Sequence, residues 1–80
     1  MPSYRPEVLD ELAVHGIVPK PSTRPDVIRD YLSDLYRYEI RTLKRRLLAG
    51  EFPKGEYLAR VVELRIRYPL LSIPVHLWMR

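Results

Sequence analysis

Apolar residues between positions 23 and 49 recur with the period of a helix. They form a stripe made of Ile28, Leu32, Leu35, Tyr36, Ile40, Leu43 and Leu47. Steps of three or four residues, with a single step of one from Leu35 to Tyr36, keep these side chains on one side of an α-helix. Thr23 stands three residues before Asp26, with Pro25 between them, and this capping-box arrangement predicts a helix start. We expect one helix over residues 23–49, about 39 Å long at 1.5 Å per residue and ended by Gly50.

A second apolar pattern follows Pro53 and stops at Pro69, which cannot continue a helix. The side chains available for packing in this segment are Tyr57, Leu58, Val61, Val62, Leu64 and Tyr68. Only a few residues separate this helix from the long one. The two are therefore expected to form an antiparallel hairpin of residues 23–49 and 53–68.

The two ends of the chain complete the predicted all-α fold. A short N-terminal helix is expected over residues 6–15, opened by a proline and closed by Gly16. The prolines in the connector of residues 17–25 forbid helix there. The apolar C-terminal tail, LLSIPVHLWMR, is kinked at Pro74 and is expected to fold back onto the core. The long helix exceeds its partner by roughly 15 Å, so these ends or another chain must cover the remainder.

Composition places the chain among small globular proteins. Eighty residues, 46% hydrophobic and 30% charged, suit one domain over residues 1–80. The absence of cysteine excludes disulfides, thiolate zinc sites and cysteine nucleophiles, and it fits a reducing compartment. The opening MPSYRPEVLDEL lacks the apolar centre of a signal peptide, and the apolar segment from Leu70 to Met79 is too short for a membrane span. We expect a cytoplasmic protein without membrane contact.

Residues 47–64, LLAGEFPKGEYLARVVEL, carry leucine, glycine and aromatic residues at a characteristic spacing. Within residues 43–66 the chain resembles the SHOCT hairpin, a short helical domain with the order Leu-x-x-Gly-x-hydrophobic, a capping residue, then Glu-aromatic. The matching positions are Leu47, Gly50, Phe52, Glu56, Tyr57 and Leu64. Pro53 stands where Thr or Ser is usual, and Gly55 stands where a helix former is expected. The resemblance implies an oligomerisation or tethering role rather than an activity.

A basic run occupies the second half of the long helix. Its exposed side should carry four cations, which we call the basic ridge: Arg37, Arg41, Lys44 and Arg45. Bases near a helix C-terminus are favoured by the helix dipole, so the ridge can simply be a solvated face. It can also contact several phosphates of RNA or DNA. No helix-turn-helix or zinc-finger pattern accompanies it, so such binding is expected to be independent of sequence.

Beside the apolar stripe runs a flank that we call the tyrosine flank, made of Val27, Tyr31 and Tyr38. Tyrosine is common at protein interfaces because one end of its side chain is apolar and the other is wet. The flank can shield the rim of the core, stack on nucleic-acid bases or contact another chain.

Glu39 and Arg46 interrupt the stripe itself, seven residues apart. Burying either charge alone would cost several kcal/mol, on the order found for unpaired buried ions. They can pair at the edge of the core, with Arg65 of the next helix as a partner. Alternatively, they meet a second subunit and set its register. We predict self-association, with a dimer favoured, through the tyrosine flank together with Glu39 and Arg46.

The sequence contains no catalytic constellation. His15 lies at an expected helix end, where it can act as a cap, and His76 lies in the apolar tail as a core histidine. The carboxylates of Asp26, Asp30 and Asp34 lack the Glu-x-x-His partners of a metal-binding bundle. No serine has a neighbouring histidine to activate it. We expect no enzyme activity, cofactor, metal or small-molecule substrate.

These observations predict a small non-catalytic module for protein interaction or homo-oligomerisation. The alternative is a sequence-nonspecific RNA- or DNA-binding protein that uses the basic ridge. The formal net charge of +4 permits an anionic partner but does not require one.

Overall fold

The computed structural model describes residues 3–80, which form helices and turns. The α-helices are α1 (Pro6–Val14), α2 (Pro25–Leu48) and α3 (Tyr57–Ile66). The 3₁₀ helices are η1 (Lys54–Glu56), η2 (Pro69–Ser72) and η3 (Val75–Leu77). Residues 3–80 contain no β-strand, only an isolated bridge between Tyr4 and Met79. The all-α class predicted from the sequence is confirmed.

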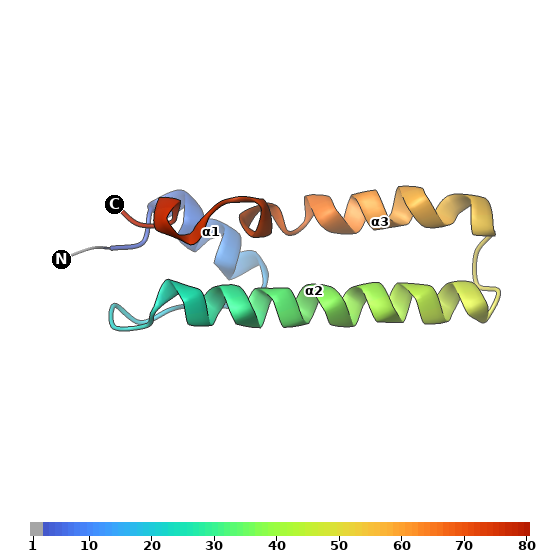
Figure 1. The fold of residues 1–80 in the computed structure, drawn as a ribbon, viewed down its shortest axis with the longest axis horizontal. Coiled ribbons are helices and arrows are strands. Elements are labelled where there is room, and N and C mark those ends of the chain that lie inside the picture. The colour runs from blue at the N-terminus through green and yellow to red at the C-terminus, as the bar shows by residue number, and fades with distance from the viewer. Residues whose placement is uncertain (1–2) are drawn as a thin grey trace.

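α2 and α3 lie side by side and antiparallel, and they give the molecule the form of a rod (Figure 1). α3 covers only the half of α2 nearest to the turn that joins them. α1, η2 and η3 occupy the other half, where both chain ends lie. The rod measures 50 × 17 × 16 Å with a radius of gyration of 15.0 Å, against about 12 Å for a compact chain of this length. In the half near the turn, α2 and α3 lie side by side without a third helix (Figure 1).

The start of α2 is set by Pro25. The residue before a proline is held in an extended conformation, and Arg24 accordingly has φ −73° and ψ 136° and acts as the N-cap. The predicted capping box at Thr23 is wrong, because Thr23 lies one residue too early. Its hydroxyl instead accepts a hydrogen bond from the Lys20 N–H at 3.0 Å. The Arg24 guanidinium pairs with Asp26 at 2.7 Å beside the helix start.

The main core lies at the end of the rod that holds the chain ends. Its fully buried side chains are Leu12 from α1, Leu32 from α2 and Trp78 from the tail. The remaining buried members of this cluster are Tyr4, Val8, Ile17, Ile28, Leu64, Tyr68 and Leu70. Trp78 donates its indole N–H to the Ile73 carbonyl at 3.1 Å, which satisfies the polar atom of this buried side chain. The tail therefore lies against the core rather than in solvent.

Backbone hydrogen bonds join the two ends of the chain. The Arg5 N–H donates to the Trp78 carbonyl at 2.9 Å. The Arg5 side chain adds a bond from Nε to the Leu77 carbonyl at 3.0 Å. We call the pairing of residues 3–5 with residues 77–80 the end clasp. It fixes the segment before α1 against the tail.

The turn after α2 follows the hydrogen-bond pattern of a Schellman motif. Gly50 has φ +75°, a left-handed conformation that favours glycine, and it ends α2 where the sequence predicts. The Gly50 N–H bonds to the Leu47 carbonyl at 3.0 Å, and the Glu51 N–H bonds to the Arg46 carbonyl at 3.1 Å. Phe52 follows in the turn between α2 and η1 and is buried.

Candidate functional site

The tyrosine flank lies at the surface, on one side of α2. Val27, Tyr31 and Tyr38 are each more than half exposed. Asp34 also points to solvent on this side of the helix, between the two tyrosines. Exposed aromatic rings of this kind are typical of protein interfaces. The flank stays a predicted contact surface, interrupted by one charge.

Glu39 has a partner within the chain. The hydroxyl of Tyr68, which follows α3, donates a hydrogen bond to the Glu39 carboxylate. Burial, and then this hydrogen bond, raise the pKa of Tyr68 above its usual value. Tyr68, and not the expected Arg65, satisfies the charge that interrupts the stripe of α2.

The ring of Tyr68 also joins the ends of α1 and α3 to α2. It stacks on the His15 imidazole, with ring centres 4.3 Å apart and planes at 22°. It meets the Tyr36 ring edge to face at 5.4 Å. Nε2 of His15 lies 2.8 Å from the Arg67 carbonyl, and it must carry the proton because a carbonyl only accepts. His15 stands at the C-cap position of α1, where the sequence places it, and its ring ties that helix end to Arg67, the residue after α3.

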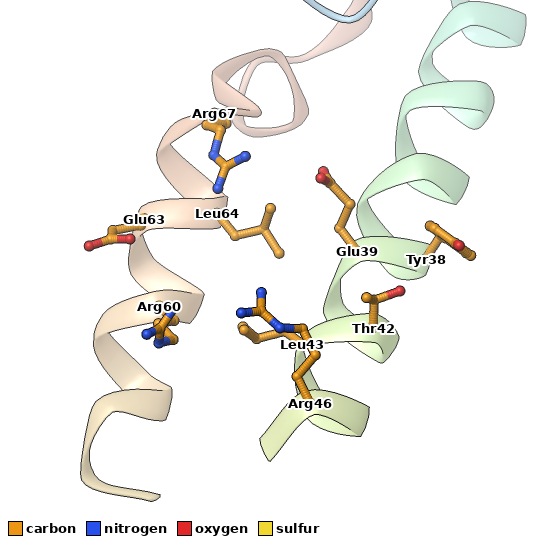
Figure 2. Close-up of a pocket in the computed structure, with 9 residues that line it drawn as sticks. All are labelled: Tyr38, Glu39, Thr42, Leu43, Arg46, Arg60, Glu63, Leu64 and Arg67. Carbon is orange, nitrogen blue, oxygen red and sulfur yellow. The ribbon is translucent and has the colours of Figure 1, made fainter. Parts of the chain in front are cut away.

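A groove runs between α2 and α3 on one side of the rod (Figure 2). Its volume is about 280 Å³, and its lining residues are Tyr38, Glu39, Thr42, Leu43, Arg46, Arg60, Glu63, Leu64 and Arg67. Figure 2 shows Glu39, Arg46 and Arg67 directed into the space between the helices, whereas Glu63 is directed away from α2. The volume lies just below the range of small-molecule sites, and the lining carries charges of both signs. We therefore do not assign a ligand to this groove.

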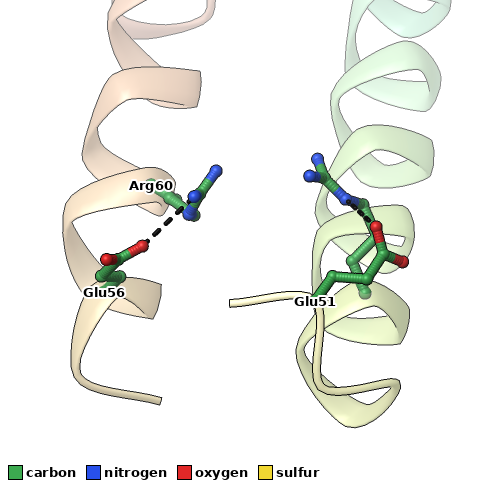
Figure 3. Close-up of polar contacts among 4 residues, drawn as sticks. Glu51, Glu56 and Arg60 are labelled. Carbon is green, nitrogen blue, oxygen red and sulfur yellow. Dashed lines mark hydrogen bonds and ion pairs between the residues drawn. The ribbon is translucent and has the colours of Figure 1, made fainter. Parts of the chain in front are cut away.

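Arg46 and Arg60 close the end of the groove next to the turn. Their guanidinium carbons lie 5.9 and 4.3 Å from the centre of the Phe52 ring, within the range of cation–π contacts. Arg46 pairs with Glu51 and Arg60 pairs with Glu56, each at 3.2 Å (Figure 3). Such exposed ion pairs contribute at most about 1 kcal/mol each. Their larger effect is to cover Phe52, and the role predicted for Arg46 at a second subunit stays a prediction.

The basic ridge lies on the side of α2 that faces away from α3. Its four side chains are exposed and fall within roughly 100° of arc at 3.6 residues per turn. Arg37 pairs with Asp34 at 3.5 Å. The other three cations, Arg41, Lys44 and Arg45, make no ion pair with any residue in the described range 3–80. They remain available to an anionic partner.

The outer face of α3 is apolar, a feature that the sequence pattern did not predict. Leu58, Val62 and Ile66 are spaced by four residues and are 73%, 46% and 71% exposed. We call these residues the α3 outer stripe. The sequence predicts Leu58 and Val62 as packing positions, and this is wrong because the helical period turns both away from buried Leu64. The sequence of α3 contains two apolar rows, one with Leu64 and one with Leu58, Val62 and Ile66. Periodicity alone does not determine which of the two rows faces α2.

The described residues hold no ready-made metal site. Within residues 3–80, no three His, Asp or Glu side chains gather so that they could bind a metal ion. His76, predicted as a core histidine, is exposed instead. None of the helices in this part of the chain has both the length and the apolar character that a bilayer crossing requires.

No family model, no curated protein and no solved structure matches the chain. Three exposed surfaces lie on α2 and α3: the tyrosine flank, the basic ridge and the α3 outer stripe.

Proposed function

We propose that this chain is a small non-catalytic protein-interaction module that associates with copies of itself, with a dimer favoured. One observation carries the proposal: α3 is apolar on two sides and only one side is covered. Leu64 is buried towards α2, whereas Ile66, two positions later, is mostly exposed. Apolar side chains that gather on an exposed helix face commonly mark a site of protein interaction. A second surface is therefore expected to cover the α3 outer stripe.

The shape of the molecule supports the same proposal. In the half of the rod near the turn, α2 and α3 pack without a third helix. The buried side chains of this half are few, with Leu43 and Phe52 at its centre. Two helices alone cannot enclose a core, whereas two such pairs side by side form a four-helix bundle. A second copy would supply the missing pair.

The expected dimer is weak. Fully burying one Val, Leu or Ile side chain contributes about 1.5–3 kcal/mol. Six side chains, three from each copy, would contribute on the order of 10 kcal/mol. Association itself costs about 4–15 kcal/mol in lost freedom. Because these terms nearly balance, the proportion of dimer should depend visibly on protein concentration.

Two sequence features add support. The SHOCT-like pattern of residues 43–66 implies oligomerisation or tethering. The absence of cysteine is in keeping with a reducing compartment, so the proposal places the module in the cytoplasm.

Size-exclusion chromatography with light scattering tests the proposal, with nucleic-acid and protein absorbance recorded on the same peak. We expect the mass of two chains at high protein concentration and a shift towards one chain on dilution, with a protein-like absorbance ratio. The mass of one chain at every concentration would contradict self-association.

A second candidate function is sequence-nonspecific binding of RNA or DNA by the basic ridge. The supporting observation is that Arg41, Lys44 and Arg45 are exposed and have no ion-pair partner in residues 3–80. Cations held on one face of a helix can follow a phosphate backbone by displacing its counterions.

Titration of labelled duplex DNA at several salt concentrations tests this second candidate. If all four ridge cations contact phosphates, log affinity should fall with log salt with a slope of about −3 to −4. The Arg41→Glu, Arg45→Glu double variant should then lose binding, whereas the Tyr31→Ala, Tyr38→Ala variant should keep it. Affinity that is insensitive to salt would remove this function.

A further inference from the structure

The α3 outer stripe fits a second copy of the same chain. We infer that two copies pack lengthwise in a parallel, two-fold arrangement, so that Leu58, Val62 and Ile66 each face the same residue of the other copy. The inference rests on the proposed self-association and names the surface and the geometry that produce it.

The stripe is the better of the two apolar surfaces for this contact. Its three aliphatic residues follow one another at four-residue spacing, so no position of the row itself is charged, and Arg65 borders the row. The tyrosine flank instead carries the exposed carboxylate of Asp34 between Tyr31 and Tyr38. The centres of protein interfaces are depleted of charged residues. The uninterrupted row is therefore the one that two copies can bury.

Charges beside the stripe favour the parallel direction. At 3.6 residues per turn, Arg65 and Glu63 lie on opposite sides of the stripe, and Glu63 is directed away from α2 (Figure 2). Neither side chain makes an ion pair with any residue from 3 to 80. In a parallel pair the two-fold axis runs along the helices, and the Arg65 side of one stripe lies next to the Glu63 side of the other. Arg65 of each copy therefore meets Glu63 of the other. An antiparallel pair would place the Arg65 sides of the two stripes next to each other, so that like charges meet.

The area of contact also favours the parallel direction. The rod is 50 Å long and 17 Å wide, so only contact along its whole length could approach the roughly 800 Å² that each partner contributes to a standard interface. α3 occupies one half of the rod (Figure 1). An antiparallel pair centred on Val62 would overlap only near the turns. Parallel rods overlap along their full length.

Cysteine cross-linking tests the arrangement directly, because the chain has no cysteine of its own. Leu58→Cys, Val62→Cys and Ile66→Cys are prepared as three single variants and oxidised mildly. A disulfide requires Cα atoms within about 7 Å. All three variants are expected to give cross-linked dimers on a non-reducing gel. Arg41→Cys, which is exposed on the far side of α2, is the matched control and should remain a single chain.

The outcomes separate failure of the inference from failure of the proposed function. Cross-linking at Val62 alone would indicate an antiparallel pair and overturn the inference, because the two Leu58 residues would then lie about 12 Å apart along the helices. Cross-linking of Tyr38→Cys but of no α3 variant would also overturn it, while the proposed self-association would stand. A wild-type mass of one chain would defeat both.

A charge swap provides an independent readout. Arg65→Glu and Glu63→Arg should each weaken the dimer several-fold in light scattering. The double variant should restore it, because the cross-copy pair is re-formed with its signs exchanged. Leu48→Glu, at an exposed position on α2, should leave the dimer unchanged. A double variant weaker than both single variants would overturn the parallel pairing.

Discussion

At the residue scale, Tyr68 explains how α2 can carry a carboxylate on its packed side. The phenol hydroxyl donates to Glu39, while the ring packs against His15 and Tyr36. A carboxylate that is partly withdrawn from water needs such a donor, since leaving it unsatisfied costs on the order of 1–3 kcal/mol. One side chain thus supplies both a polar partner and an apolar surface at the meeting point of three helical segments.

The Tyr68→Phe substitution should therefore destabilise the protein at neutral pH. The ring contacts remain, but Glu39 loses its donor. We expect the free energy of unfolding to fall by about 1–2 kcal/mol, measured by urea denaturation followed by circular dichroism. Tyr38→Phe is the matched control, because Tyr38 is exposed, and it should change the stability very little.

The same hydroxyl should make stability sensitive to alkaline pH. An unfolded tyrosine loses its proton near pH 10, whereas the pKa of folded Tyr68 is raised by burial and by Glu39. Above about pH 10 the unfolded state therefore releases a proton that the folded state keeps, which favours unfolding. The stabilising contribution is complete below that pH and is lost as the pH rises. Wild type should lose stability there more steeply than Tyr68→Phe, and equal slopes would contradict the assignment.

At the scale of elements, the turn between α2 and α3 depends on one glycine. Gly50 has φ +75°, whereas Gly55, within η1, does not have a positive φ. An added Cβ would meet no atom within 4 Å at either position. The two glycines therefore differ in backbone conformation and not in available space.

Alanine substitutions at these glycines should act in opposite directions. Gly50→Ala should lower the free energy of unfolding by about 1–2 kcal/mol, the cost of a left-handed residue that carries a side chain. Gly55→Ala should be neutral or stabilising by up to about 1 kcal/mol, because it restricts the unfolded chain. Thermal denaturation of both variants measures the difference. Equal effects would show that the conformation of Gly50 does not limit the turn.

The course of α2 could be predicted from the sequence, whereas the packed side of α3 could not. The period from Ile28 to Leu47 is enough to predict α2 and its inward side, and the exposure of the basic ridge follows from it. The predicted start of α2 at Thr23 is wrong, because Pro25 holds Arg24 in an extended conformation and makes it the N-cap residue. The two apolar rows of α3 are equivalent in sequence, so only the packed structure distinguishes buried Leu64 from exposed Ile66. The contact of Glu39 with Tyr68 joins positions 29 apart, beyond any local pattern.

At the scale of the whole molecule, the narrow rod should depend on its neighbour for stability. A folded state that dimerises is stabilised by mass action, so its melting temperature rises with concentration. We expect the Tm of the wild type to increase by several degrees between micromolar and millimolar protein, as measured by calorimetry. The Tm of Val62→Glu should be independent of concentration, because a carboxylate placed in the middle of the stripe opposes the contact. A constant wild-type Tm would count against self-association.

The end clasp has a consequence for the order of folding. It links Arg5 to Leu77, which are 72 positions apart, and the entropy lost in closing a loop grows with its length. The short turn after α2 closes a far smaller loop, so α2 and α3 should pair early and the clasp should form last. α1 would then dock late, when Val8 and Leu12 enter the main core. Because α3 presents its outer stripe before α1 docks, two chains can meet while each is still incompletely folded, and assembly becomes part of the folding pathway.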